Sequence, residues 1–143
     1  MGFECLGAKK TSKKTIEILA VLFIVSTLLG MAFSFIGLVD AVKVEAAIKK
    51  IFLASPFLLA YLFIVRVIAE EIFFRGFLVK EIGIIGSAVS FGLMHVLYFS
   101  IAEVIAATVL GVLLAWFYKR NKSLYPNIIA HMAYNIASFG LMW

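Results

Sequence analysis

The chain has little of what a disulfide-stabilised domain or a soluble enzyme needs. Of its 143 residues one is cysteine, two are proline, two are histidine and only 15% are charged, whereas 64% are hydrophobic. The single cysteine, Cys5, excludes an intrachain disulfide and a cysteine metal cluster. So much apolar surface with so little charge exceeds what one soluble core buries, and it is typical of a polytopic membrane protein.

The excess of basic residues does not indicate nucleic-acid binding. The net charge is +5, but the basic residues gather in short runs, such as 9–14 and 119–122, with no aromatic residues interleaved to form a binding stripe. Such runs beside apolar segments are typical of the cytoplasmic side of a membrane protein. We therefore expect a multi-pass protein of the cell membrane whose N-terminus lies in the cytoplasm. A third basic stretch, residues 43–50, does not agree with this orientation, because it falls on the opposite side of the membrane.

Apolar segments divide the chain into about five membrane-spanning helices, since one crossing takes about 20 residues. The predicted class is an all-α transmembrane bundle, formed as a single domain over residues 1–143. The first segment is too long for a signal-peptide core, so it is interpreted as an uncleaved span. Residues 40–50 are expected to form a short interfacial helix, and Pro56 to be tolerated inside the second span. The expected spans are 18–39, 51–79, 82–102, 101–118 and 123–143.

Charged residues stand where the chain should lie in lipid. Glu70, Glu71 and Arg75 fall inside the second span, and one such charge at the bilayer centre costs about 2.5–3.5 kcal/mol on insertion scales. Glu71 and Arg75 are four apart and can pair on one helix face. Glu70 is rotated by about 100° from Glu71, so it is available as a general base. Arg66, four residues before Glu70, offers an alternative in which both acids are only paired.

The two histidines lie at a depth similar to that of the acidic pair. With a rise of about 1.5 Å per residue, Glu70, His95 and His131 lie roughly 15, 20 and 12 Å along their helices from one membrane face. Asn135 follows His131 by four residues, and Phe91 precedes His95 by four. Each residue also has a purely structural interpretation, as a salt bridge, an interhelical hydrogen bond or a packed ring. Periodicity does not decide whether these helices face one another.

Three motifs carry a family resemblance. Residues 70–76 (EEIFFRG) resemble the EExxxR motif, residues 91–95 the FxxxH motif and residues 131–135 the HxxxN motif of the CPBP family of intramembrane proteases. That family includes the type II CAAX prenyl proteases and the bacteriocin-immunity, or abortive-infection, proteins. The order and separation agree, and the resemblance covers a protease-like core at about 52–143.

The resemblance implies an endopeptidase that hydrolyses membrane-associated peptides or proteins. Glu70 would activate water, His95 would bind or orient that water, and His131 with Asn135 would stabilise the oxyanion. A base, a water site and oxyanion donors are the set that acyl transfer requires. No serine or cysteine nucleophile motif competes with them. The residues that would brace the site are Glu71, Arg75 and Phe91.

A metal requirement is the open point of this chemistry. Glu70, His95 and His131 have the composition of a two-histidine, one-carboxylate zinc site, but the HExxH spacing is absent. Glu70 cannot easily act both as a ligand and as a base. We therefore favour a mechanism with no obligatory metal, with zinc as the alternative.

Two other functions stay open at this stage. One is a non-enzymatic membrane immunity or interaction protein of the same family, in which the polar cluster only braces the bundle. The other is an ion or proton carrier that uses Glu70 and the histidines as a relay. The resemblance also implies about eight helices, whereas span length leaves room for about five. A homo-oligomer, a partner or a minimal form of the fold would have to close the site.

Overall fold

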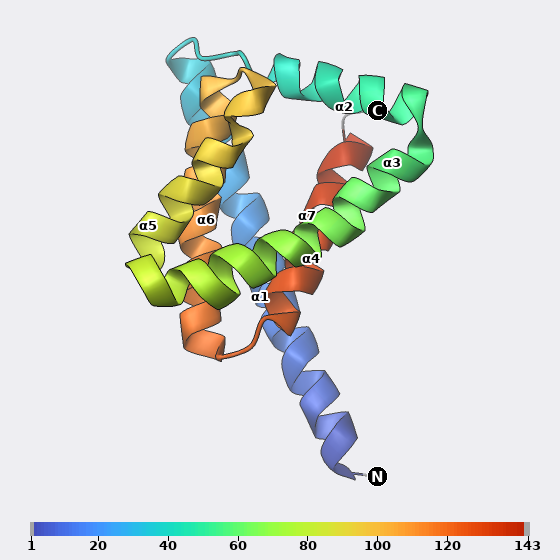
Figure 1. Cartoon of the computed structure of the whole chain (residues 1–143), viewed down its shortest axis with the longest axis vertical. Coiled ribbons are helices and arrows are strands. Elements are labelled where there is room, and N and C mark those ends of the chain that lie inside the picture. The colour runs from blue at the N-terminus through green and yellow to red at the C-terminus, as the bar shows by residue number, and fades with distance from the viewer. Residues whose placement is uncertain (1, 142–143) are drawn as a thin grey trace.

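The computed structural model describes residues 2–141, and of residues 2–10 the backbone alone. The fold is all-α, as predicted, and the chain folds into a bundle from which the beginning of α1 projects (Figure 1). The elements are α1 (Gly2–Phe35), α2 (Val42–Ala54), α3 (Pro56–Tyr61), the π-helical η1 (Leu62–Arg66), α4 (Val67–Glu70), the π-helical η2 (Glu71–Leu78), α5 (Val79–Leu93), the 3-10 turn η3 (Met94–Tyr98), α6 (Ile101–Asn121) and α7 (Tyr125–Leu141).

Two clusters of buried apolar side chains hold the bundle together. The larger joins α1, α6 and α7, and the smaller joins η2, α5 and α6. The larger contains Ile18, Leu22, Leu110, Leu114, Phe117 and Ala130, and the smaller contains Phe74, Phe91 and Ala107. The second cluster matters for function because it includes Phe91 of the FxxxH motif.

In the part of the chain that the structure describes, two helices are long and apolar enough to cross a membrane. They are residues 11–35 of α1 and the whole of α6. Many large apolar side chains face outward, including Phe35 at 93% and Phe57 at 89% exposure. This surface is what a helix bundle presents to lipid rather than to water.

The prediction that Pro56 lies inside a spanning helix is wrong. Ser55 is extended (φ −162°, ψ 104°) and ends α2, and its Oγ accepts a hydrogen bond from the N–H of Leu58 at 3.2 Å. Pro56 is therefore the first residue of α3, where its missing N–H costs no helical hydrogen bond. The interfacial helix accordingly extends to Ala54, and the chain turns sharply before α3 (Figure 1).

The helix predicted over 82–102 is shorter in the structure, where it runs from the kink at Gly83 to the end of η3 at Tyr98. Gly83 has φ 77° and ψ −178°, so it interrupts the helical geometry within α5. The chain reverses there, because that backbone conformation is open to glycine and strained for other residues (Figure 1). At the other end, α5 gives way to η3, and Phe99 (φ 55°) stops the helix before α6.

A glycine contact sets the distance between α5 and α6. A Cβ on Gly92 would collide with the hydroxyl of Thr108 and would lie 2.8 Å from the carbonyl oxygen of Val104. The backbone of α5 therefore packs directly on the side chains and carbonyls of α6. This contact fixes the end of α5 that carries Phe91 and leads to His95.

Asp40 fastens the loop before α2 to the beginning of α6. Its carboxylate accepts hydrogen bonds from the backbone N–H groups of Ile101 at 2.7 Å and Ala102 at 3.1 Å, and from the hydroxyl of Ser100 at 2.9 Å. Desolvation raises the pKa of Asp40, but these hydrogen bonds outweigh it, so the pKa lies below its ordinary value. Lys43 donates to the carbonyl oxygen of Phe99 at 2.9 Å and adds a second attachment.

Candidate functional site

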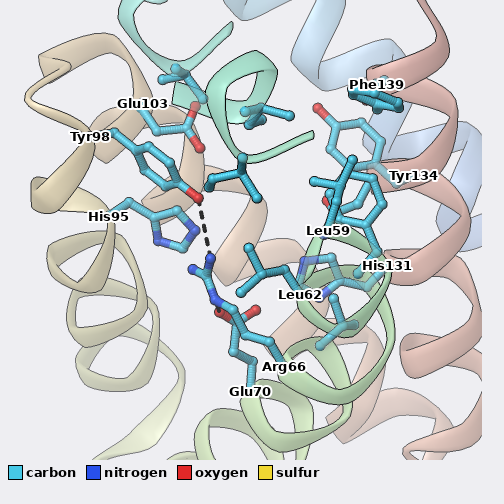
Figure 2. Close-up of a pocket in the computed structure, with 17 residues that line it drawn as sticks. Leu59, Leu62, Arg66, Glu70, His95, Tyr98, Glu103, His131, Tyr134 and Phe139 are labelled. Atoms are coloured by element: carbon cyan, nitrogen blue, oxygen red, sulfur yellow. Dashed lines mark hydrogen bonds and ion pairs between the residues drawn. The ribbon is translucent and has the colours of Figure 1, made fainter. Parts of the chain in front are cut away.

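The polar residues of the motifs meet in one cavity. Its volume is about 170 Å3, and α2, α3, η1, α4, η3, α6 and α7 contribute to its wall (Figure 2). Glu70, His95, His131 and Asn135 all line it. Three apolar residues of α2, Val44, Ile48 and Ile51, cover one side. Their side chains face the cavity, whereas Lys43 and Lys50 of the same helix are exposed on the outside of the bundle.

A smaller cavity of about 80 Å3 adjoins the first one. His95, His131 and Asn135 line both cavities, together with Glu103 and Tyr134. The second cavity extends from this shared wall toward Phe91 and the α1–α6 contact. The two histidines therefore stand between two spaces, so their rings are approachable from more than one side.

Glu71 is the centre of the buried polar contacts. The predicted ion pair with Arg75 is present, with Oε1 at 3.2 Å from Nη1, and both side chains are about 1% exposed or less. The same carboxylate oxygen lies 2.9 Å from Nδ1 of His131. Asn127 donates through Nδ2 to Glu71 at 3.4 Å and to the carbonyl oxygen of Leu114 at 2.7 Å. Glu71 therefore connects η2 with α7, a role that its spacing from Arg75 did not indicate.

The contact with Glu71 determines how His131 presents its ring. A carboxylate only accepts hydrogen bonds, so Nδ1 of His131 carries the proton and donates. His95 has the same arrangement, because its Nδ1 lies 2.8 Å from the carbonyl oxygen of Phe91. Nε2 of each ring takes no part in these contacts, and both rings project into the cavity (Figure 2).

The ring of Phe91 packs against Arg75, His95 and His131. Its ring centroid lies 4.2 Å from the guanidinium carbon of Arg75, 4.8 Å from the ring of His95 and 5.9 Å from the ring of His131. Among the described residues, the nitrogens of Arg75 make no hydrogen bond. The guanidinium is therefore held by the charge of Glu71 and by the face of the aromatic ring.

Glu70 is paired as well, but differently. Nε of Arg66 lies 2.7 Å from Oε1 of Glu70, which realises the alternative that the spacing of these residues offered. Arg66 also donates through Nη1 to the hydroxyl of Tyr98 at 3.2 Å. The pair is more open than the Glu71–Arg75 pair, since the Arg66 side chain is 31% exposed. Oε2 of Glu70 is left for another donor.

Sequence reasoning did not select Tyr98, Glu103 or Tyr134 for the site. Tyr98 is 32 residues away from Arg66, and no local spacing reports that contact. Glu103 was visible as an acid at the start of an apolar helix, which is a signal of the same kind as Glu70. It lines the cavity although it belongs to none of the three motifs.

The residues that a zinc ion would need are not gathered into a ligand set. Among the side chains of residues 11–141, no group of three or more histidine, cysteine, aspartate or glutamate residues is placed to hold a metal. Glu70, His95 and His131 share the cavity, but the carboxylate of Glu70 is turned to Arg66. The metal requirement stays a prediction.

Comparison with known families decides the class. Residues 52–137 match the family described as Type II CAAX prenyl endopeptidase Rce1-like. The chain belongs to this family. The match contains all three motifs, and it gives no support to the immunity branch of the resemblance. No curated protein and no solved structure matches the chain. Membership of this membrane protease family, with two candidate membrane helices, indicates a membrane location.

Proposed function

We propose that this CAAX endopeptidase family member is an intramembrane endopeptidase in which Glu70 activates water. The observation that carries the proposal is the convergence of Glu70, His95, His131 and Asn135 on one cavity. A base, two imidazoles and an amide within one partly enclosed space are suited to hydrolysis of an amide bond. The substrate is a membrane-associated peptide or protein.

The proposed reaction assigns one task to each residue. Nε2 of His95 accepts a hydrogen bond from the water, and Glu70 takes the proton as the water oxygen attacks the carbonyl carbon. Asn135 donates to the resulting oxyanion through its amide, and His131 donates through Nε2 as the doubly protonated ring. The proton on Glu70 then passes to the leaving amide nitrogen, and the carbon–nitrogen bond breaks.

Glu71 supports this chemistry without contacting the substrate. Its hydrogen bond to Nδ1 fixes the orientation of the His131 ring, and Arg75 neutralises its charge in the core. This is how a second carboxylate commonly orients a working imidazole. Glu71 is therefore a positioning residue, and Phe91 is the wall against which both histidines pack.

We propose a five-span arrangement with the N-terminus in the cytoplasm. The two basic runs lie at the same end of the bundle, because Lys14 donates to the carbonyl oxygen of Asn121 at 3.5 Å. Arg120 and Glu17 form an ion pair at 2.7 Å beside them. A basic face of this kind favours the cytoplasmic side.

Comparison of the native chain with Glu70→Gln tests the proposal. Membranes from cells that produce either form would be profiled for peptides, and the purified proteins would be placed in liposomes with a farnesylated, internally quenched CAAX peptide and its unprenylated copy. We expect a product that the native protein releases and Glu70→Gln does not. Absence of any such product in both assays would overturn the proposal, and ion uptake without a product would point to a carrier.

Treatment with a chelator distinguishes the mechanism with no obligatory metal from the zinc-dependent one. If no metal is obligatory, the rate of product release is unchanged after dialysis against a chelator and is not increased by added zinc. Activity that disappears on chelation and returns only with zinc would show instead that Glu70 and the histidines rearrange into a metal site.

A further inference from the structure

Arg66 lies in the cavity with more than one acidic partner. It is paired with Glu70 at 2.7 Å and donates to the hydroxyl of Tyr98 at 3.2 Å. Its charge also acts on Glu103 of α6, which lines the same cavity. The guanidinium of Arg66 is therefore in contact with the carboxylate of Glu70 and acts at longer range on the carboxylate of Glu103.

Glu103 is the carboxylate that has no task in the proposed reaction. Its backbone N–H donates to the Ser100 hydroxyl at 3.1 Å, but among the side chains described, those of residues 11–141, its carboxylate takes part in no hydrogen bond or ion pair. Figure 2 shows this side chain directed into the cavity, beyond the hydroxyl of Tyr98 as seen from Arg66. A charged acid without a partner in an apolar bundle is costly, so the carboxylate of Glu103 is a place that a cation such as the Arg66 guanidinium can occupy favourably.

The cavity is also small for the proposed substrate. Its volume is about 170 Å3, whereas sites for drug-sized ligands measure about 300–1,000 Å3. Arg66 bridges α4 and η3 through its contacts with Glu70 and Tyr98, so it lies across the space that a peptide would enter (Figure 2). Its side chain is 31% exposed, whereas that of Arg75 is 1% exposed, so Arg66 is the arginine with room to move.

We propose that Arg66 is a positioning residue with two stations, and that Glu103 is the second one. In the empty cavity Arg66 holds Glu70 and is anchored by Tyr98. When a peptide enters, Arg66 swings to Glu103, which widens the site and leaves both oxygens of Glu70 to water. This inference rests on the proposed hydrolytic function. It assigns opposite effects to two neighbouring residues, because Tyr98 stabilises the closed position and Glu103 the open one.

The kinetic constants of two conservative variants test the sign of these effects. Tyr98→Phe keeps the ring beside His95 and removes only the acceptor for Arg66, so it should lower KM. Glu103→Gln removes the receiving charge, so it should raise KM by about tenfold, the size expected for one hydrogen bond to a charged group. Both variants should change kcat much less than KM, since neither residue contacts the reacting atoms. The substrate is the farnesylated peptide, or a synthetic copy of the peptide that the cell comparison identifies.

A double variant tests whether Glu103 acts through Arg66. Arg66→Met removes the group that closes the cavity, so KM should fall, and Arg66→Lys should restore part of the native value. The double variant Arg66→Met/Glu103→Gln should then have the same KM as Arg66→Met alone, because Glu103 no longer has a guanidinium to bind. Glu81→Gln, an exposed acid on α5 outside the cavity, is the matched control and should change neither constant.

The outcomes distinguish this inference from the proposed function. If native protein releases no product, the hydrolytic function itself fails. If native protein is active and the KM of Glu103→Gln equals that of Glu81→Gln, the two-station role of Arg66 is wrong. It is equally wrong if Tyr98→Phe and Glu103→Gln shift KM in the same direction, or if the effect of Glu103→Gln persists in Arg66→Met. Thermal unfolding of each variant in detergent shows that the compared proteins are folded.

Discussion

Two arginine–glutamate pairs occupy neighbouring turns of one helical segment, and they have different surroundings. We call the first the buried cluster (Glu71, Arg75, Asn127 and His131) and the second the cavity cluster (Arg66, Glu70, Tyr98 and Glu103). In both, the arginine and glutamate are four residues apart. The side chains of Glu71 and Arg75 are at most 1% exposed, whereas those of Arg66 and Glu70 are 31% and 10% exposed.

This difference separates a fixed site from an adjustable one. The buried cluster is bonded to α7 through His131 and packed against Phe91, so a change in it disturbs several elements. The members of the cavity cluster all line the cavity, where water or a substrate can reach them. The sequence spacing is the same in both clusters. Burial and the number of partners therefore decide which pair stabilises the fold and which pair is available for the proposed reaction.

The largest contrast is expected in activity. Glu70→Gln should reduce the rate of peptide release by about 10²–10⁴-fold, the usual contribution of a general base. The variant should remain folded, because Gln still accepts a hydrogen bond from Arg66. The measurement is the initial rate of product release in liposomes. A Glu70→Gln protein as active as the native one would show that the cavity cluster is structural, like the buried cluster.

Stability should distinguish the two arginines. Arg75→Met leaves the carboxylate of Glu71 without its cation in the core, which should destabilise the protein by about 3–5 kcal/mol. Arg66→Met should cost about 1 kcal/mol or less, because its pair is partly exposed. Thermal unfolding in detergent of the two variants gives the comparison. Equal losses would mean that the two clusters do not differ in the way proposed.

The contact between α5 and α6 supports the buried cluster, and Gly92→Ala tests it. The added Cβ would collide with Thr108, so we expect a loss of about 1–3 kcal/mol, as for other overpacked contacts. Gly30→Ala is the control, because a Cβ at that position of α1 meets nothing within 4 Å. That control should be neutral or slightly stabilising, since alanine favours helix over glycine. A Gly92→Ala protein as stable as the control would contradict the close approach.

Asp40 should give the smallest effect, on the side of the cavity that α2 covers. Its pKa lies below the ordinary value because of the hydrogen bonds at the start of α6, so its contribution to stability is present above the ordinary pKa and is lost as the pH falls through the lowered one. Asp40→Asn should therefore unfold at a lower temperature than the native protein near pH 7, and this difference should shrink as the pH falls below the ordinary pKa of an aspartate. A difference that does not change with pH would show that hydrogen bonding rather than charge carries the effect.

Part of the fold followed from local patterns. Apolar runs and charge spacing predicted the all-α class, the beginning and end of α6 within a few residues, and the pairing of Glu71 with Arg75. Helix ends were predicted poorly where backbone conformation decides them. The extended Ser55 before Pro56 breaks a helix that the hydropathy pattern treated as continuous, and Gly83 with its positive φ makes the turn one residue inside the predicted boundary at 82.

The candidate site shows the same division. The motif spacing selected the residues that line the cavity, because residues four apart share a helix face. It did not select Tyr98 or Glu103, since their contacts with Arg66 arise between elements distant in the chain. Nor did it show that Glu71 holds His131, which lies 60 residues away.

Composition and motif order thus account for the helical class, the family and the candidate chemistry, because each depends on residue type and local spacing. The contact of η2 with α7 through Glu71 and His131, and that of η1 with η3 through Arg66 and Tyr98, decide the rest. They give Glu71 a second partner in the core, and they leave Glu70 beside an arginine that still has room to move. The physical reason is that burial and charge pairing are properties of neighbours in space. Two pairs with the same spacing along the chain therefore acquire different roles only when the helices meet.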